Sequence, residues 1–241
     1  MLKKALAASV AAAALATLAS PASAALRLAF SDGVNAFSCV DNAACDLDTD
    51  PNQISIGVTT LGSFSILGTF SASQNGPPAL AAGNISITNN SSSSKTLKMA
   101  FSDNNFLGGN ASFKASVGGQ WFGAMNSDIT SGFWVDGLNV EGASTATDTP
   151  GTEIESYFNS AATNDPTSFA FNPGPIGFIH AQPFSMTEGV VLDLVGGGRV
   201  IGNLQSIEAV PEPRTWAMMG LGFALMGLVA FKRKRSNTAF A

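Results

Sequence analysis

Short segments in which hydrophobic and polar residues alternate dominate the middle of the chain. In residues 84–88 the two isoleucines lie on one side and Ser86 on the other, and residues 111–117 repeat the pattern around Lys114. A period of two residues is typical of a strand with one buried face. The segments of this kind are residues 26–30, 54–58, 64–72, 84–88, 96–102, 111–117, 168–171, 184–195 and 204–210.

Turn-forming sequences such as SDG, NGPP, NNSSSS and GGGR separate these segments. Glycine, proline and asparagine at such breaks favour tight reversals of the chain. Short strands at this spacing predict an all-β fold, an antiparallel β-sandwich of jelly-roll-like form, over residues 25–209. A segment of this length is enough for one hydrophobic core, so we expect a single domain there.

One segment departs from the period of two. In residues 152–162, one helix face is indicated by the i, i+3, i+4, i+7 spacing of Ile154, Tyr157, Phe158 and Ala161. Thr152 and Glu155 before and within this stretch have the spacing of a capping box, which satisfies free N–H groups at a helix start. The sequence therefore predicts one short helix here.

Residues 1–24 have the three parts of a secretory signal peptide. Lys3 and Lys4 precede an apolar run over residues 5–19, and Ala22-Ser23-Ala24 supplies small residues at a cleavage site. We expect a signal helix that is removed after Ala24 as the chain is exported; the alternative is a buried N-terminal helix.

The C-terminal region contains an uncharged apolar run from Trp216 to Phe231. As a helix it would span about 24 Å, slightly less than the roughly 30 Å hydrocarbon core of a bilayer. Four basic residues follow at once: Lys232, Arg233, Lys234 and Arg235. Because basic clusters stay in the cytoplasm, the pattern predicts a transmembrane helix with residues 236–241 as a cytoplasmic tail. The alternative is a core helix of a soluble domain.

A proline-flanked acid precedes the apolar run. Pro211 and Pro213 disfavour helix at the residues before them, so the chain around Glu212 is expected to be extended and open to a processing enzyme. The alternative is a stiff spacer.

Taken together, residues 210–235 resemble the PEP-CTERM sorting signal of Gram-negative bacteria, with motif, apolar helix and basic cluster in order. Trp216 and Ala217 make it similar to the PEPxxWA variant. The resemblance implies anchoring in the inner membrane and recognition by an exosortase, a membrane-embedded processing enzyme of the cysteine type. It also implies a host that often makes extracellular polysaccharide.

Charge is distributed unevenly along the chain. Residues 25–209 hold five basic and sixteen acidic residues, a net charge of −11, whereas the whole chain carries −5. An acidic domain of this kind argues against nucleic acid and anionic polysaccharide as direct partners.

Cys39 and Cys45 are the only cysteines. In an exported protein they are expected to form a disulfide, with two free buried thiols as the alternative.

Just after the two cysteines, Asp46, Asp48 and Asp50 alternate, and such hard oxygen ligands suit Ca²⁺. The glycine and glutamate of an EF-hand loop are missing, so a solvated acidic turn is the alternative, and no other cofactor is expected.

The chemistry of a catalytic site is not apparent. His180 is the only histidine, which excludes a multi-histidine metal site, and no Gly-x-Ser-x-Gly motif occurs.

The sequence therefore predicts a non-enzymatic protein of the cell envelope or extracellular matrix. The alternative is a carbohydrate-binding or adhesive sandwich with Trp121, Phe133 and Trp134 stacking on exopolysaccharide or other glycans, unless these aromatics pack in the core. A secreted polysaccharide hydrolase is the least favoured possibility.

Overall fold

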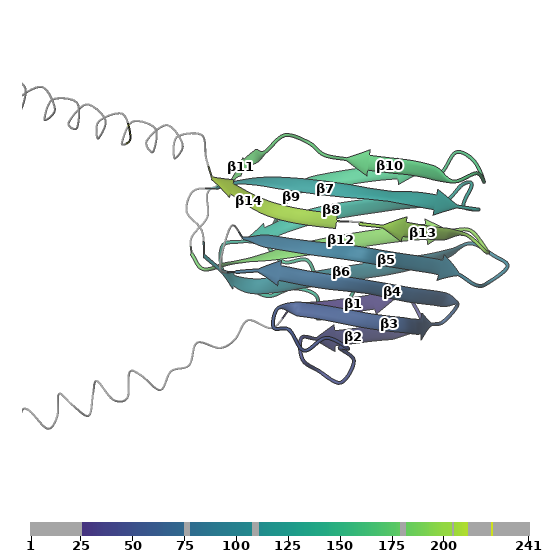
Figure 1. The fold of residues 1–241 in the computed structure, drawn as a ribbon, viewed down its shortest axis with the longest axis horizontal. Coiled ribbons are helices and arrows are strands. Elements are labelled where there is room, and N and C mark those ends of the chain that lie inside the picture. The colour runs from purple at the N-terminus through teal and green to yellow at the C-terminus, as the bar shows by residue number, and fades with distance from the viewer. Residues whose placement is uncertain are drawn as a thin grey trace, which may run out of the picture.

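A computed structural model of the chain describes residues 26–74, 78–107, 111–178, 182–203, 205–211 and 223. Apart from helical backbone at Phe223, the elements in these ranges are strands, arranged in two stacked sheets (Figure 1). Sheet A has the order β2 (Ala36–Val40), β1 (Arg27–Ser31), β6 (Lys95–Phe106), β12 (Phe184–Leu194), β8 (Asp128–Asp136) and β9 (Thr152–Ser160). Sheet B has the order β10 (Thr167–Phe171), β7 (Ala111–Phe122), β13 (Arg199–Gly202), β5 (Ala79–Asn89), β4 (Phe64–Ser73) and β3 (Gln53–Leu61), joined by β11 (Ile176–Phe178) and β14 (Gln205–Pro211).

The strand pairs of both sheets are antiparallel. β13 and β14 share one position between β5 and β7, interrupted after Gly202, and β10 and β11 follow the other side of β7 in the same way. The chain crosses from one sheet to the other repeatedly, for example between β2 and β3 and between β5 and β6. The predicted antiparallel β-sandwich is confirmed.

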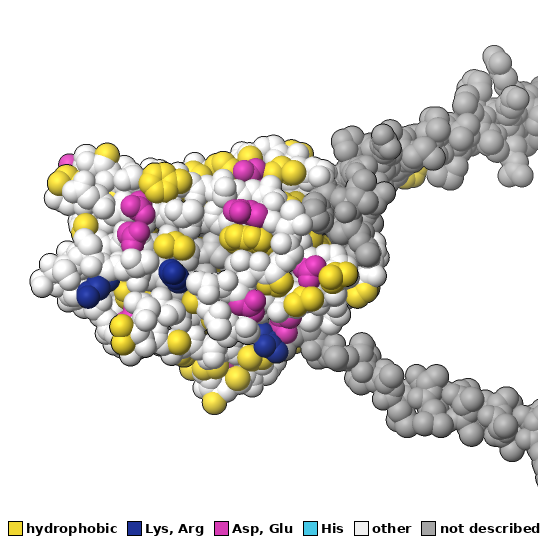
Figure 2. Space-filling view, turned by 180° about the vertical axis from the view of Figure 1, so that it is seen from behind, with side chains coloured by type: hydrophobic (Ala, Val, Ile, Leu, Met, Phe, Trp, Pro, Cys, Tyr) yellow, Lys and Arg dark blue, Asp and Glu magenta, His cyan; other side chains and the backbone are white. Residues whose placement is uncertain are grey.

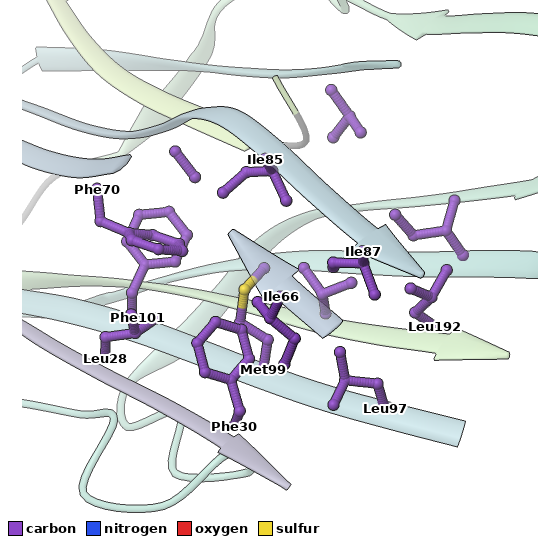
Figure 3. Packing of buried hydrophobic residues seen from close by; sticks show 14 of the residues in the cluster. Leu28, Phe30, Ile66, Phe70, Ile85, Ile87, Leu97, Met99, Phe101 and Leu192 are labelled. Carbon is purple, nitrogen blue, oxygen red and sulfur yellow. The ribbon is translucent and has the colours of Figure 1, made fainter. Parts of the chain in front are cut away.

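The inner faces of the two sheets pack into one hydrophobic core (Figure 3). Phe70 of sheet B meets Phe30 and Phe101 of sheet A, with ring centroids 6.1 and 5.2 Å apart. These edge-to-face contacts add a directional attraction to the burial of apolar area. The period of two in β5 is what places Ile85 and Ile87 in this core.

The two ends of the sandwich differ in their connections. At the turn end, short connections join the strands: residues 32–35, 62–63, 90–94, 123–127, 161–166 and 195–198. At the tail end, β14 finishes at Pro211, and two long loops, residues 41–52 and 137–151, cover strand ends. The second loop also folds over the outer face of sheet A, where the Gly142 N–H donates to Ser102 Oγ at 3.0 Å.

The helix predicted around residues 152–162 is wrong, because this segment forms β9 at the edge of sheet A. A β-bulge leaves Ile154 as an extra residue in the register with β8. Ile154 and Tyr157 therefore both pack against the core, whereas Phe158 points away from it and is 62% exposed. The bulge thus produces the i, i+3 spacing of a helix within a strand.

Candidate functional site

The C-terminal motif begins inside the last strand of the sandwich. Val210 and Pro211 of β14 pair with Ser112 and Ala111 of β7, so the backbone is extended through Pro211. The pairing of β14 with β5 ends earlier, at Glu208. Within the described residues, the end of β14 is therefore held by hydrogen-bond pairing on one side only.

The other targeting segments that the sequence predicts lie outside the described residues. They are the signal peptide at residues 1–24, Glu212 and Pro213, the apolar run at residues 216–231 other than Phe223, the basic cluster at residues 232–235 and the tail at residues 236–241. His180 also lies outside them. In the ranges that are described, no helix has the length and apolar character needed to cross a membrane. The signal peptide and the membrane span stay predictions.

A groove on the outer face of sheet A contains the half-buried Trp134. It has a volume of about 280 Å³ and lies between β8, β12 and the 137–151 loop. The six-membered ring of Trp134 occupies the space above Gly132 of β8 and its cross-strand partner Gly189 of β12. A Cβ atom at Gly132 would lie 2.2 Å from Trp134 Cη2, so a glycine there makes room for the indole.

Polar groups line the rest of this groove. Thr130, Thr147 and Thr149 contribute hydroxyls, and Glu153 of β9 lies directly across from Trp134. Figure 2 shows this side of the molecule, where hydrophobic and acidic side chains lie near one another. An aromatic ring beside hydroxyls and a carboxylate combines an apolar contact surface with hydrogen-bonding groups, as small-molecule sites usually do.

The two other aromatic residues considered for sugar stacking are buried. Phe133 is fully covered in the core, and Trp121 is 1% exposed. Trp121 packs against Phe169, and its Nε1 donates to Asn159 Oδ1 at 2.9 Å. Core packing is therefore the correct interpretation for these two side chains, and only Trp134 of the three lines a groove.

A second, larger groove of about 690 Å³ crosses the outer face of sheet B. Small residues form its floor, among them Gly83, Gly118 and Gly202, and the amides of Asn84 and Asn203 also line it. None of its lining residues is charged. This surface suits a neutral polar ligand, but it lacks an indole.

The acidic turn at residues 46–50 uses its carboxylates to hold the backbone. Asp46 Oδ1 accepts from the N–H groups of Asp48 and Ser55, both at 2.9 Å, and Asp48 Oδ1 accepts from the Asp50 N–H at 2.8 Å. Nowhere in the described part of the chain do three or more His, Cys, Asp or Glu side chains come together in a way that would hold a metal ion. The Ca²⁺ site at Asp46, Asp48 and Asp50 stays a prediction without support from this geometry.

The predicted disulfide is present beside this turn. It joins Cys39, which is buried in β2, to Cys45 in the 41–52 loop, with the two Cα atoms 5.8 Å apart. The bridge ties the edge of sheet A to the first long loop of the tail end.

Asp103 is a buried acid at the tail end of β6. Burial raises its pKa to about 7, and the negative charges of Glu141 and Asp41 act in the same direction. Gln74 Nε2 opposes this by donating to Asp103 Oδ2 at 2.9 Å. Glu141 in turn pairs with Arg27, whose Nε lies 2.9 Å from its Oε2. The tail end thus holds a group that titrates near neutral pH.

Glu188 lies on the inner side of β12, between its cross-strand partners Phe101 and Phe133. It is fully buried, and neither carboxyl oxygen has a hydrogen-bond partner among the described residues. Burial raises the pKa of Glu188 well above its ordinary value, which favours the neutral acid. Its position within the hydrophobic alternation of β12, between Met186 and Val190, is the sequence signal that indicates this buried acid.

Comparison with known proteins adds one specific match. The family described as the PEP-CTERM protein-sorting motif matches residues 209–235. No curated protein matches the sequence. Similar solved structures include TmCBM61 in complex with beta-1,4-galactotriose, at 9% identity over 61% of this chain and 89% of that chain with a TM-score of 0.32. Another is the C-terminal CBM6 of LamC from Zobellia galactanivorans, at 8% identity over 65% and 99% with a TM-score of 0.25.

With TM-scores below 0.5, these likenesses do not bear on what the chain binds. The sorting-motif match is of a different kind, because it falls on the segment in which motif, apolar run and basic cluster follow one another. The chain therefore carries a PEP-CTERM protein-sorting motif at residues 209–235, which supports an exported protein.

Proposed function

We propose that this protein acts without catalysis in the cell envelope or extracellular matrix, as cargo that an exosortase processes. The observation that carries the proposal is the place of the sorting match, whose first residues belong to β14. The sorting segment therefore follows the folded domain directly, and the β-sandwich is the part that is delivered. Its partners are the exosortase and the inner membrane.

The proposed orientation rests on charge. The basic cluster at residues 232–235 stays in the cytoplasm, and the apolar run at residues 216–231 holds the chain in the bilayer until it is processed. The acidic domain then lies outside, where it has no role with nucleic acid.

Intact-mass measurement tests this proposal. In the host, the mature protein is expected to begin at Ala25 and to lack the residues that follow the cleavage point near Pro211. In a host without its exosortase the chain should extend to Ala241. Equal masses in the two hosts would contradict processing by this enzyme.

A second candidate function is binding of a neutral glycan in the groove on sheet A. It is favoured by the indole of Trp134 beside three threonine hydroxyls and Glu153. A sugar ring would place its C–H face on the indole and its hydroxyls on the polar walls.

A glycan array followed by calorimetry with the best neutral oligosaccharide tests this second function. Trp134→Ala should weaken binding at least about tenfold, equivalent to about 1.4 kcal/mol. Val58→Ala is the control, because Val58 is exposed on β3 of sheet B, away from this groove. Absence of any bound glycan, or equal affinities of Trp134→Ala and the unaltered chain, would remove glycan binding at this groove.

A further inference from the structure

The distance between the sandwich and the bilayer is limited by the chain that joins them. Pro211 is still paired with Ala111 of β7, and the apolar run begins at Trp216. The five residue-to-residue steps from Pro211 to Trp216 span at most about 18 Å when fully extended. A headgroup layer is roughly 5–8 Å thick, so the tail end of the sandwich must lie close to the lipid surface while the segment is inserted.

The tail end exposes large apolar side chains next to this point. Leu138 is 85% exposed, Leu107 62% and Val140 50%. Leu107 directly follows β6, and Leu138 and Val140 lie at the start of the 137–151 loop that follows β8. We call these three residues the tail-end patch. Apolar side chains grouped at one end of a domain mark a contact surface rather than the scattered exposure that is normal for a protein.

Hydrogen bonds hold the two loops of the patch side by side. The Asn105 N–H donates to Asn139 Oδ1 at 2.8 Å, and Asn139 Nδ2 donates to Asn105 Oδ1 at 2.8 Å. Asp136 fixes the second loop, since its two carboxylate oxygens accept the N–H groups of Leu138 and Val140 at 3.0 Å each. The patch is therefore presented by a braced backbone, and the charge of Asp136 is turned inward.

We propose that the tail-end patch is a lipid-docking surface, on which the sandwich rests against the bilayer before its sorting segment is cut. This inference rests on the proposed function, because it needs the apolar run to be inserted. Leu107, Leu138 and Val140 enter the headgroup boundary, where apolar side chains are commonly buried by about 5–10 Å. The net charge of −11 over residues 25–209 favours a zwitterionic surface over a strongly anionic one.

Site-specific fluorescence on the full chain tests the docking surface. The native cysteines are joined in the disulfide, so one added cysteine can carry an NBD label. Leu138→Cys reports on the patch. Val34→Cys is the matched control, because Val34 is 92% exposed but lies at the turn end. Gly220→Cys reports on the apolar run itself. Each labelled chain is reconstituted into phosphatidylcholine vesicles with acyl-chain-brominated lipid.

The label at position 138 should be blue-shifted and quenched by brominated lipid at least about twofold more than the label at position 34. Equal quenching at positions 138 and 34, with strong quenching at position 220, would overturn the docking surface and leave the membrane anchor intact. A blue shift at position 138 without quenching would mean contact with a second protein copy, and it would also overturn the proposal. No quenching at position 220 would instead mean that the proposed anchor has failed.

Discussion

The turn end and the tail end of the sandwich are closed by different kinds of contact, although the same strands supply both. At the turn end, the short turns bond directly to one another, and buried Asn89 is the clearest case. Its Nδ2 donates to Ser93 O at 2.9 Å within its own hairpin and to Leu194 O at 2.8 Å in the neighbouring turn. The turn end is thus fixed by short turns that hold one another.

The tail end is held by polar and charged side chains that join strand ends to the long 137–151 loop or to each other. Asn105 bonds to Asn139, Arg27 pairs with Glu141, and Gln74 reaches Asp103. It also gathers buried acids and exposed leucines, which are costly for a domain that stands alone in water. The comparison teaches that the contacts of the turn end serve only to stabilise the fold, whereas the tail end also carries features that fit the proposed role at the membrane.

The largest expected effect is a pH dependence that comes from the tail end. The unfolded chain ionises Asp103 from about pH 3.8, whereas the folded protein retains its proton to about pH 7, so the free energy of unfolding falls as pH rises through this window. The slope for one such group is at most about 1.4 kcal/mol per pH unit. In Asp103→Asn, the free energy of unfolding, measured by urea unfolding, should therefore fall less steeply between pH 4 and 7 than in the unaltered protein.

Asp165→Asn is the control for this series, because Asp165 belongs to a turn-end loop away from Asp103. Glu188, whose pKa burial also raises, adds a slope of the same sign that begins near its ordinary pKa of 4.5. If Asp103→Asn leaves the slope between pH 4 and 7 unchanged, the assignment of a titrating acid to the tail end is wrong.

Asn89→Ala should give the next largest loss, at the turn end. It removes the side-chain donor to the Leu194 carbonyl and one of two donors to the Ser93 carbonyl, and it frees the Ser91 N–H that Asn89 Oδ1 accepts. Together these losses cost about 2–4 kcal/mol of unfolding free energy. Asn90→Ala is the neighbouring control, since Asn90 is exposed and its side-chain amide donates to Ser65 Oγ, while its backbone bond to Ser63 O is kept in the variant. Chemical unfolding of the two variants compares them, and similar losses for both would show that Asn89 does not hold the turn end.

Removal of the disulfide should cost less. The bridge closes a short loop, because Cys39 and Cys45 are six residues apart, so replacing both by serine should lower the unfolding free energy by about 2 kcal/mol. Urea unfolding of the unaltered protein with and without reductant provides the comparison. Identical midpoints in both conditions would mean that the bridge does not brace the tail end.

Asp136→Ala is expected to have the smallest effect, about 1–2 kcal/mol, because the two loop N–H groups it frees lie near solvent. Hydrogen exchange should show faster exchange of the Leu138 and Val140 amides with little change at the turn end. Uniform acceleration over the whole sandwich would contradict a local role for Asp136.

The sequence predicts the strands whose inner faces alternate regularly, as in β4 and β5, and it predicts the turns at residues 32–35, 90–94 and 195–198. It misses β8 because the inward position between Ile129 and Phe133 is the polar Ser131, which interrupts the hydrophobic alternation. It misreads β9 because a bulge at Ile154 depends on pairing with another strand. Short strands such as β13 carry too few residues to show a period.

For the candidate sites, local chemistry is predictable and burial is not. The disulfide follows from export and the proximity of two cysteines in the sequence. Composition does not distinguish Trp134, which lines a groove, from Trp121, whose indole the core covers. The bonds of the tail end, such as Asn105 to Asn139, join the end of β6 to the 137–151 loop, and no motif links these two segments.

The orientation of the C-terminal segment is the claim on which the rest depends, and a reporter fused after Ala241 measures it directly. The account predicts that a green fluorescent protein fusion is fluorescent in the cytoplasm and that an alkaline phosphatase fusion is inactive, in cells without the exosortase. An active phosphatase together with a dark fluorescent protein would place this terminus outside the membrane and contradict the account.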